Sequence, residues 1–161
     1  MPVSFLSPSQ REHYGRFAGD PSSDELTRYF HLDDADRLAI ADRRGDHNRL
    51  GFALQLTTVR FLGTFLENPA AVPTAVMQTL SRQLVISADD GLAEYAQAKQ
   101  HFEHAEQIRA RYGYREFNEP RAGFRLSRWL YAQCWTGTER PSVLFDRATT
   151  WMIARCRARR S

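Results

Sequence analysis

Three aspartates, Asp33, Asp34 and Asp36, lie within four positions of one another. Grouped carboxylates hold the magnesium ions of many nucleases, so this cluster could form a metal site. Acidic side chains also cap helix N-termini and interact favourably with the helix dipole, and a helical pattern begins at this point. Because no strand is predicted that would bring two carboxylates to one metal ion, we interpret the cluster as helix capping. Replacing all three residues by asparagine is then expected to affect stability only mildly.

A second polar group has the pattern of a DNA-reading helix. A short helix is predicted at residues 92–96, a turn at 97–98, and a longer helix at 99–112. In a helix-turn-helix motif, the first residues of the second helix enter the major groove, where amide, imidazole and cationic side chains bind base edges. A plain helical hairpin shows the same pattern and stays open as the alternative. The residues that would read bases are Lys99, Gln100, His101 and His104.

Arginines recur after this helix. Those from residue 121 onward are spaced four and three apart, which places them on one helix face as a phosphate-binding stripe or, alternatively, as an ordinary solvated face. The predicted phosphate contacts are Arg109, Arg111, Arg115, Arg121, Arg125 and Arg128, and the residues expected to point inward from the same helix are Phe124, Trp129, Leu130 and Ala132.

A smaller basic cluster precedes the apolar segment in the first half of the chain. It lies in the loop and first helical turn before that segment, where free backbone N–H groups also favour phosphate. One member, Asn48, has the alternative role of a simple helix cap. The residues of this cluster are Arg43, Arg44, His47, Asn48 and Arg49.

Composition narrows the class of protein. With 161 residues, 42% of them hydrophobic and 25% charged, the chain is typical of a globular protein of one domain or two small ones. The longest apolar run is interrupted by Arg60, and no leader peptide is recognisable, so a cytoplasmic protein without a membrane span is expected. Cys134 and Cys156 lack a paired spacing and are expected to be buried, without a disulfide or zinc site. No motif for a nucleophile, metal or nucleotide occurs, so no cofactor is expected.

The charge distribution is uneven. The chain has 22 basic and 19 acidic residues, but from Arg109 onward twelve arginines accompany only four acids. Arginine forms forked contacts with phosphate and guanine, so this excess favours a polyanionic partner. Because 21 of the 22 basic residues are arginine, a GC-rich genome offers an alternative explanation.

Helix signals run through the whole chain. Ser7-Pro8 opens a helix that ends near Gly19, Ser22 with Glu25 has capping-box spacing, and a proline starts each of the last two helices. A helix with Leu38, Ile40 and Ala41 inward is expected to stop at Gly45. After a loop bracketed by Pro69 and Pro73, Val76, Leu80 and Leu84 have the spacing of one helix face, and further helices are predicted at about 120–135 and 141–157. The segment His47–Leu66 is apolar on all sides and must be enclosed.

These signals predict an all-α fold. A polar, turn-rich segment at 87–91 coincides with the change in charge balance and divides the chain into two helical subdomains, 1–86 and 87–161, each of helix-turn-helix type.

Several blocks of the sequence resemble a known family. They are FLSPSQREHYGRF at 5–17, HLDDADR at 31–37, HNRLGFALQLTTVRFLGTFL at 47–66, YREF at 114–117 and ERPSVLFDRATTW at 139–151. Together they resemble the N-terminal region of cointegrate-forming class II bacterial transposases of the Tn-three type. The resemblance implies two helical DNA-binding subdomains that recognise the terminal inverted repeats of the transposon. It also implies that strand cleavage belongs to a separate RNase H-like domain, which this chain lacks.

The sequence therefore predicts a non-enzymatic, sequence-specific binder of double-stranded DNA at transposon ends, in the cytoplasm at the nucleoid, with homodimerisation through regions absent here. The alternative is a helical protein-interaction or regulatory domain that associates with a full-length transposase. Steep salt dependence of duplex binding would favour the first reading.

Overall fold

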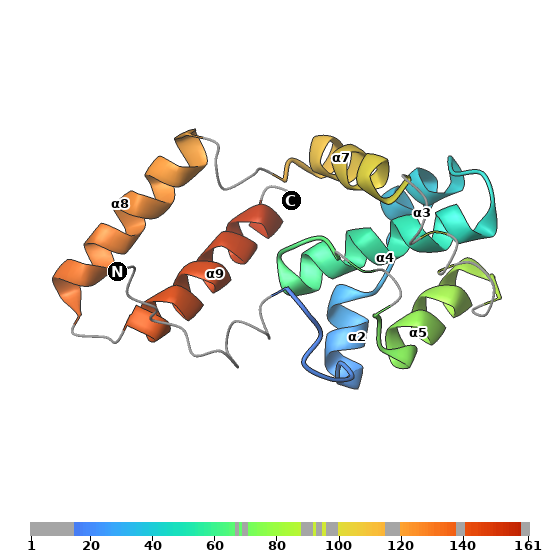
Figure 1. The fold of residues 1–161 in the computed structure, drawn as a ribbon, viewed down its shortest axis with the longest axis horizontal. Coiled ribbons are helices and arrows are strands. Elements are labelled where there is room, and N and C mark those ends of the chain that lie inside the picture. The colour runs from blue at the N-terminus through green and yellow to red at the C-terminus, as the bar shows by residue number, and fades with distance from the viewer. Residues whose placement is uncertain are drawn as a thin grey trace. The chain divides into compact units, whose positions relative to one another are not determined.

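The fold was analysed in a computed structural model that describes residues 15–66, 68, 71–87, 92, 95, 100–114, 120–137 and 141–158, without the side chains of 120–122, 141–142 and 153–158. Every regular element in these ranges is a helix (Figure 1). The predicted all-α fold is confirmed. The helix predicted to open at Ser7-Pro8 and the turn predicted at 97–98 lie outside the described residues.

The chain packs as two compact units. His13–Ile108 forms the first, named here the α4 unit, and the described residues from Arg109 onward form the second, named the α8–α9 unit. This division falls inside one helix, later than the polar segment at 87–91. The two DNA-binding subdomains, 1–86 and 87–161, are a division by function and stay a prediction.

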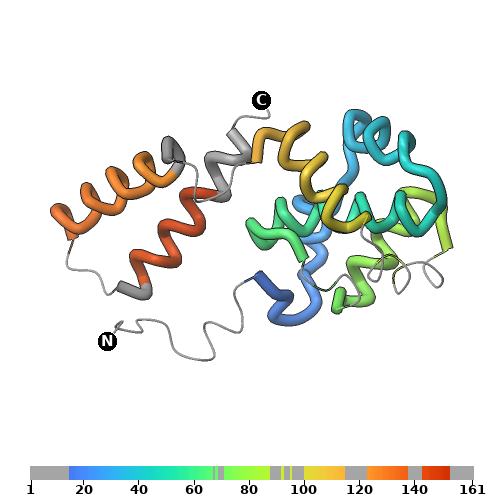
Figure 2. Tube along the Cα trace, turned by 45° about the horizontal axis from the view of Figure 1, so that its top comes forward, coloured from blue at the N-terminus to red at the C-terminus, as the bar shows by residue number. Residues whose placement is uncertain are grey.

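Helix α4, Asp46–Leu62, is the centre of its unit. Helices α2 (Ser23–Tyr29), α3 (Asp34–Ala41) and α5 (Thr74–Leu84) pack against it, as Figures 1 and 2 show from two directions. Every residue of α4 from Leu50 to Arg60 is buried. The enclosure expected from the apolar sequence is thus confirmed.

Side-chain caps fix the starts of α2 and α3. The Ser22 hydroxyl accepts from the Glu25 N–H while the Glu25 carboxylate accepts from the Ser22 N–H, which confirms the predicted capping box. Asp33 and Asp36 form the same reciprocal pair at α3. Each capping box provides side-chain acceptors for two backbone N–H groups at the start of its helix.

The start of α4 differs from expectation. Helix α3 already ends at Ala41, and α4 begins at Asp46 after the N-cap Gly45, whose φ of 80° lies in the left-handed region that favours glycine. The interpretation of Asn48 as the cap is wrong, because Asn48 lies inside the first turn and its amide donates to the Arg44 carbonyl at 2.9 Å.

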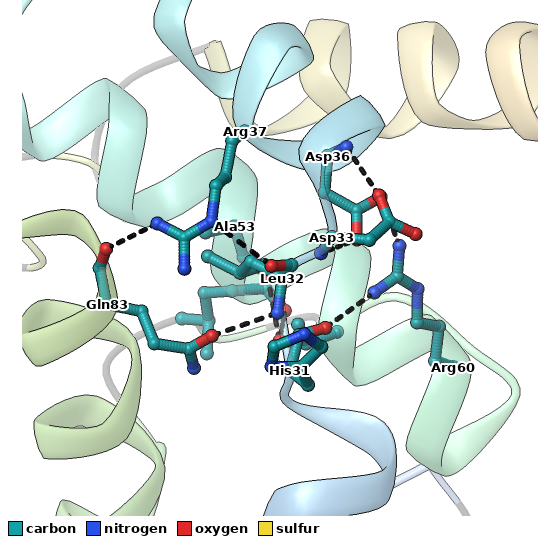
Figure 3. A network of polar contacts seen from close by, with 10 residues as sticks. His31, Leu32, Asp33, Asp36, Arg37, Ala53, Arg60 and Gln83 are labelled. Atoms are coloured by element: carbon teal, nitrogen blue, oxygen red, sulfur yellow. Dashed lines mark hydrogen bonds and ion pairs between the residues drawn. The ribbon is translucent and has the colours of Figure 1, made fainter.

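A buried ion pair joins α3 to α4. The Asp36 carboxylate, whose side chain is 1% exposed, pairs with the Arg60 guanidinium, which is 9% exposed and also donates to the His31 carbonyl at 3.2 Å (Figure 3). Capping therefore explains only part of the role of Asp36. At this position we now expect more than a mild effect of an asparagine replacement, because it would leave a buried guanidinium without its counter-charge.

The same network fastens α5 to the segment between α2 and α3. The Gln83 amide accepts from the Leu32 N–H at 2.9 Å and donates to the Phe30 carbonyl at 2.8 Å. Arg37 donates to the Gln83 carbonyl at 2.9 Å (Figure 3). Side chains of α3, α4 and α5 thus satisfy the backbone of a connection that lies partly in the core.

In the α8–α9 unit, two helices pack side by side (Figures 1 and 2). Helices α8, Pro120–Thr136, and α9, Pro141–Ala158, begin at prolines as predicted. Leu126 and Ala148 are buried between them, and the rings of Trp129 and Trp151 lie 5.5 Å apart.

The predicted inward face of α8 is only partly correct. Trp129 and Leu130 are half-buried, but Phe124 is 69% exposed and Ala132 is exposed as well, whereas Leu126 takes the buried position. Cys134 is also exposed, contrary to expectation, and the side chain of Cys156 lies outside the described part.

Helix α7, Gln100–Tyr112, ends at Gly113, whose φ is 68°. Its Phe102 is 68% exposed, whereas His104 is buried. Among the described helices, none has the length and apolar character that a membrane crossing requires.

Candidate nucleic-acid interface

The turn between α3 and α4 carries the first predicted basic cluster. Arg44 is exposed, whereas Arg43 and Arg49 are half-buried and already engaged. The Arg49 guanidinium donates to the Arg43 carbonyl at 3.3 Å and lies 3.7 Å from the Asp46 carboxylate. The side chains of this ion pair are 42% exposed at Arg49 and 67% exposed at Asp46, so the contact is screened by solvent and stabilises little. The turn therefore has one outward guanidinium, at Arg44, on a backbone that its neighbours hold in place.

A chain of ring contacts places the start of α7 next to this turn. The Arg43 guanidinium carbon lies 4.6 Å from the centroid of the Phe52 ring. The edge of the same ring packs on His104 of α7, with centroids 5.3 Å apart. Figure 1 draws the first turns of α7 alongside α3 and the beginning of α4. Two basic and polar clusters that the sequence assigned to different subdomains thus belong to one unit.

His104 is a core residue of the α4 unit. It is 5% exposed, stacks on the Tyr95 ring with centroids 5.5 Å apart, and its Nδ1 lies 3.0 Å from the Tyr95 hydroxyl. Burial, aided by the charge of Arg43, lowers the pKa of His104 to about 4. Burial also raises the pKa of Tyr95. At neutral pH a protonated phenol therefore donates to a neutral imidazole.

The Tyr95 ring occupies the space beside Gly51 of α4. A Cβ atom built at Gly51 would lie 2.4 Å from the Tyr95 ring, closer than packed carbon atoms approach one another. Glycine at this position of α4 allows the Tyr95 ring to pack directly on the helix backbone. Sequence reasoning missed Tyr95, although an isolated aromatic residue next to a helix with a central glycine is a usable signal.

Of the four predicted base-reading residues, two lie at the surface of α7. Gln100 is exposed, and His101 is half-buried with its ring centroid 3.8 Å from that of Phe102. His104 points into the core, and Lys99 lies outside the described residues. The first turn of α7 thus presents one amide and one imidazole near the turn that carries Arg44.

The predicted arginine contacts fall in the α8–α9 unit. Arg111 on the last turn of α7 is exposed and Arg109 is half-buried. Arg125 and Arg128 on α8 are both exposed. Arg115 lies outside the described residues, and Arg121 belongs to α8 but its side chain is not described. Helix α8 contains three arginines and no acidic residue.

The α3–α4 turn and the first turn of α7 suit binding of an anion better than catalysis. Guanidinium, imidazole and amide groups lie at the surface of one unit, next to the open N–H groups of the 17-residue helix α4. Carboxylates that might hold a metal are engaged elsewhere, Asp33 as a cap and Asp36 in the buried ion pair. Side chains of these types contact phosphates and base edges in complexes of proteins with DNA.

Comparisons with known proteins agree with the resemblance seen in the sequence. Residues 5–157 match the family model described as "Domain of unknown function (DUF4158)". The transposase for transposon gamma-delta of Escherichia coli (strain K12) is 46% identical over 154 residues, which are 95% of this chain and 15% of that protein. The transposase for transposon Tn3926 of Escherichia coli is 35% identical over 71% of this chain and 11% of its own length.

A further relative comes from a different bacterial group. The transposase for transposon Tn1546 of Enterococcus faecium is 31% identical over 70% of this chain and 11% of its own length. The chain thus spans about 15% or less of the length of these transposases. The family model covers nearly the whole chain, and the chain therefore belongs to the DUF4158 family, as a segment of the Tn-three-type transposases.

Proposed function

We propose that this chain binds double-stranded DNA at the terminal inverted repeats of a transposon, as the end-recognising part of a transposase. The observation that carries the proposal is the convergence of two clusters in one unit. The Arg43–Phe52–His104 contacts place the α3–α4 turn beside the first turn of α7 in a family of transposases. A bacterial transposase acts on chromosomal or plasmid DNA, so the proposed location is the cytoplasm, at the nucleoid.

The residues of this surface divide into two roles. Arg44 is the exposed guanidinium and is assigned to phosphate, while Gln100 and His101 are assigned to base edges in the major groove. Arg43 and Arg49 hold the turn through the Phe52 ring and the Arg43 carbonyl, and Asn48 holds it through the Arg44 carbonyl. His47 is half-buried in the first turn of α4 and belongs to the same surface.

Two parts of the predicted contact set change in this proposal. His104 is left out, because its buried imidazole is committed to Tyr95. Phosphate contacts from the second unit are proposed for Arg111 and Arg125, with Arg109, Arg115 and Arg121 as further candidates. Lys99 precedes α7 directly and keeps its proposed role at the base edges.

We also propose that the chain cuts no DNA by itself. It corresponds to a small share of the length of its transposase relatives, and its described aspartates near α3 serve the fold. Incubation with labelled transposon-end DNA, a target plasmid and Mg²⁺ or Mn²⁺ tests this part of the proposal. Metal-dependent cleavage by the purified chain would refute it.

The DNA-binding proposal is tested by titrating the chain with a γδ transposon end and with a scrambled duplex of the same length, at several salt concentrations. Tighter binding to the end, with affinity that falls by a log–log slope of about −0.9 for each phosphate contact, is the expected result. Selection from a pool of random duplexes provides the same test without assuming that the transposon of this chain shares its end sequence with the γδ transposon.

Variants separate the roles. Arg44→Ala should weaken binding to all duplexes alike and reduce the salt slope by about one contact. Gln100→Ala and His101→Ala should each lose about 1–3 kcal/mol of preference at one or two base pairs. Arg82→Ala, which removes an exposed arginine of α5 in the same unit, is the matched control and should bind like the wild type. Equal and salt-independent binding to both duplexes, or equal effects of Arg44 and Arg82, would contradict the proposal.

A further inference from the structure

The outward face of α8 carries three large aromatic side chains. Phe124, Tyr131 and Trp135 are 69%, 66% and 76% exposed. Spacings of seven and four place them on one side of the helix, and Arg128, four residues after Phe124, lies on the same side. The rings of Tyr131 and Trp135 are in contact, with centroids 6.0 Å apart. These four residues are named here the aromatic stripe.

The aromatic stripe is additional to the packing face of α8. Leu126 is buried and Trp129 stacks on Trp151 of α9, so the core of this unit uses the opposite side of the helix. A helix with apolar side chains on two sides has two faces to cover. Contiguous exposed aromatics of this size mark interaction sites on proteins.

We propose that the aromatic stripe is a docking surface for another part of the same transposase, and that the surface it receives is apolar with carboxylates at its edge. This proposal rests on the family to which the chain belongs and not on the proposed DNA binding. Tryptophan, tyrosine and arginine are the residues that dominate binding energy at protein interfaces, and the stripe contains one of each. The proposal assigns Arg128 to a protein contact instead of a phosphate contact.

Charge decides between possible protein partners. Helix α8 has three arginines and no aspartate or glutamate. Two copies of the stripe packed face to face would bring Arg128 and the nearby Arg125 of both copies together, and like charges across an interface are costly. A partner with carboxylates at its edge instead pairs with the Arg128 guanidinium. The charge pattern therefore disfavours a second copy of this chain.

Duplex DNA suits the stripe less well than protein. Phosphates would bind Arg128, but the duplex exterior gives Phe124 and Tyr131 no apolar surface, so their rings would stay in water or lose hydration without compensation. Most of the γδ transposase lies outside the segment similar to this chain, which is only 15% of its length, so a partner surface within the same protein is proposed there. Contacts between domains of one chain commonly bury surfaces that are part apolar and part polar.

The test measures oxidation of Tyr131 and Trp135 by hydroxyl radicals, located by mass spectrometry. It compares this chain alone with full-length γδ transposase in which the matching segment is replaced by this chain. We expect both residues to be oxidised several-fold more slowly in the full-length protein. Arg128→Glu in the full-length protein should restore oxidation to the level of the isolated chain, whereas Arg128→Lys should keep most of the protection.

Leu38→Ser is the matched control, because Leu38 is a 67% exposed apolar residue on α3, and it should leave the protection unchanged. If the full exchange does not give a folded protein with a cooperative melting transition, exchanging Pro120–Thr136 alone gives the second variant. Equal oxidation in both proteins, or protection that survives Arg128→Glu, would overturn the proposal. Protection of the isolated chain that increases with its concentration would also overturn the proposal, because it identifies a second copy as the occupant. Protection of the isolated chain only after a single-stranded oligonucleotide is added would do the same, because it identifies a nucleic acid as the occupant.

Discussion

The α4 unit and the α8–α9 unit differ in which side chains they bury and which they expose. In the first, polar side chains lie inside: Asp36, Arg60 and Gln55 are almost fully buried. In the second, aromatic side chains lie outside, with Trp135 76% exposed and Phe124 69% exposed. In the α4 unit, three helices pack around the apolar helix α4. In the α8–α9 unit, the described helices leave several aromatic rings exposed.

This difference follows from the number of helices around each core. Helix α4 is covered by α2, α3 and α5, so even its polar residues are buried and must find partners within the unit. In the α8–α9 unit, two described helices cover one face of each other, and the remaining faces stay at the surface. Helices of the same amphipathic kind thus form an enclosed core where several of them pack together, and leave an exposed apolar face where only two do.

The largest effect is expected from breaking the buried ion pair. Asp36→Asn should destabilise the α4 unit by about 3–5 kcal/mol, because it leaves the Arg60 guanidinium buried without its counter-charge. All three tryptophans of the chain lie on α8 and α9. Tryptophan fluorescence therefore reports the α8–α9 unit, while far-UV circular dichroism reports the helices of both units, so a loss seen only by dichroism belongs to the α4 unit.

Two controls sharpen this measurement. Asp34→Asn alters an exposed residue of the same helix turn and should change stability by less than about 0.5 kcal/mol. The double variant Asp36→Leu, Arg60→Met should recover most of the loss, since it removes both charges. A fluorescence transition that shifts as far as the dichroism transition would show that the two units unfold as one.

The converse change probes the core of the α8–α9 unit. Leu126→Ala should cost about 2–5 kcal/mol in that unit, because it opens a cavity between α8 and α9. Phe124→Ala, two residues earlier and on the exposed face, removes more atoms but should change stability by less than about 0.5 kcal/mol. The midpoint of urea unfolding followed by tryptophan fluorescence distinguishes them. Equal losses from the two variants would mean that Phe124 is part of a core.

The starts of α2, α8 and α9 and the enclosure of α4 were predictable because the signals for them are in the local sequence. Capping pairs such as Ser22 with Glu25, and prolines at helix starts, act within one turn, and an all-round apolar helix has a single physical outcome. The direction of a weakly amphipathic helix was not predictable. On α7, His104 replaces Phe102 in the core because its acceptor nitrogen meets the Tyr95 hydroxyl, and nothing in the local pattern announces that partner.

The buried charges show the same limit. Arg60 was visible as an isolated charge in an apolar helix, and such a residue needs an internal partner when the helix is enclosed. Which carboxylate it meets depends on the packing of α3 on α4, which brings together residues 24 positions apart. Likewise, the proximity of the α3–α4 turn and the start of α7 depends on the Phe52 ring, so no local pattern could join the two clusters.

The burial of His104 in the core makes the α4 unit sensitive to acid. Because the pKa of His104 is about 4 in the folded chain and 6.5 in the unfolded one, its contribution to stability is complete above pH 6.5 and is lost as the pH falls toward 4. Below pH 6.5 the unfolded chain takes up a proton that the folded chain does not. Urea midpoints by circular dichroism at pH 7.5 and pH 5 measure this loss.

His104→Asn keeps an acceptor for the Tyr95 hydroxyl but no longer titrates in this range, so its difference between pH 7.5 and pH 5 should be smaller than that of the wild type. His31→Asn, at an exposed position of the same unit, should retain the wild-type difference. An unchanged pH difference in His104→Asn would show that other groups cause the acid sensitivity.

The smallest effect is expected at the exposed cap of α2, which lies at the edge of the α4 unit. Ser22→Ala removes the hydroxyl that accepts from the Glu25 N–H and should cost about 1 kcal/mol. The Ser22 N–H and hydroxyl lower the pKa of Glu25, so the remaining half of the capping box should weaken as the pH falls through that pKa. Ser23→Ala, one residue later and equally exposed, is the control and should be nearly neutral. Hydrogen exchange of the α2 amides measures the effect locally. If the α4 amides also lost protection from exchange, the enclosure of α4 would depend on α2. Ser22 would then belong, with Asp36, to the residues that keep α4 enclosed.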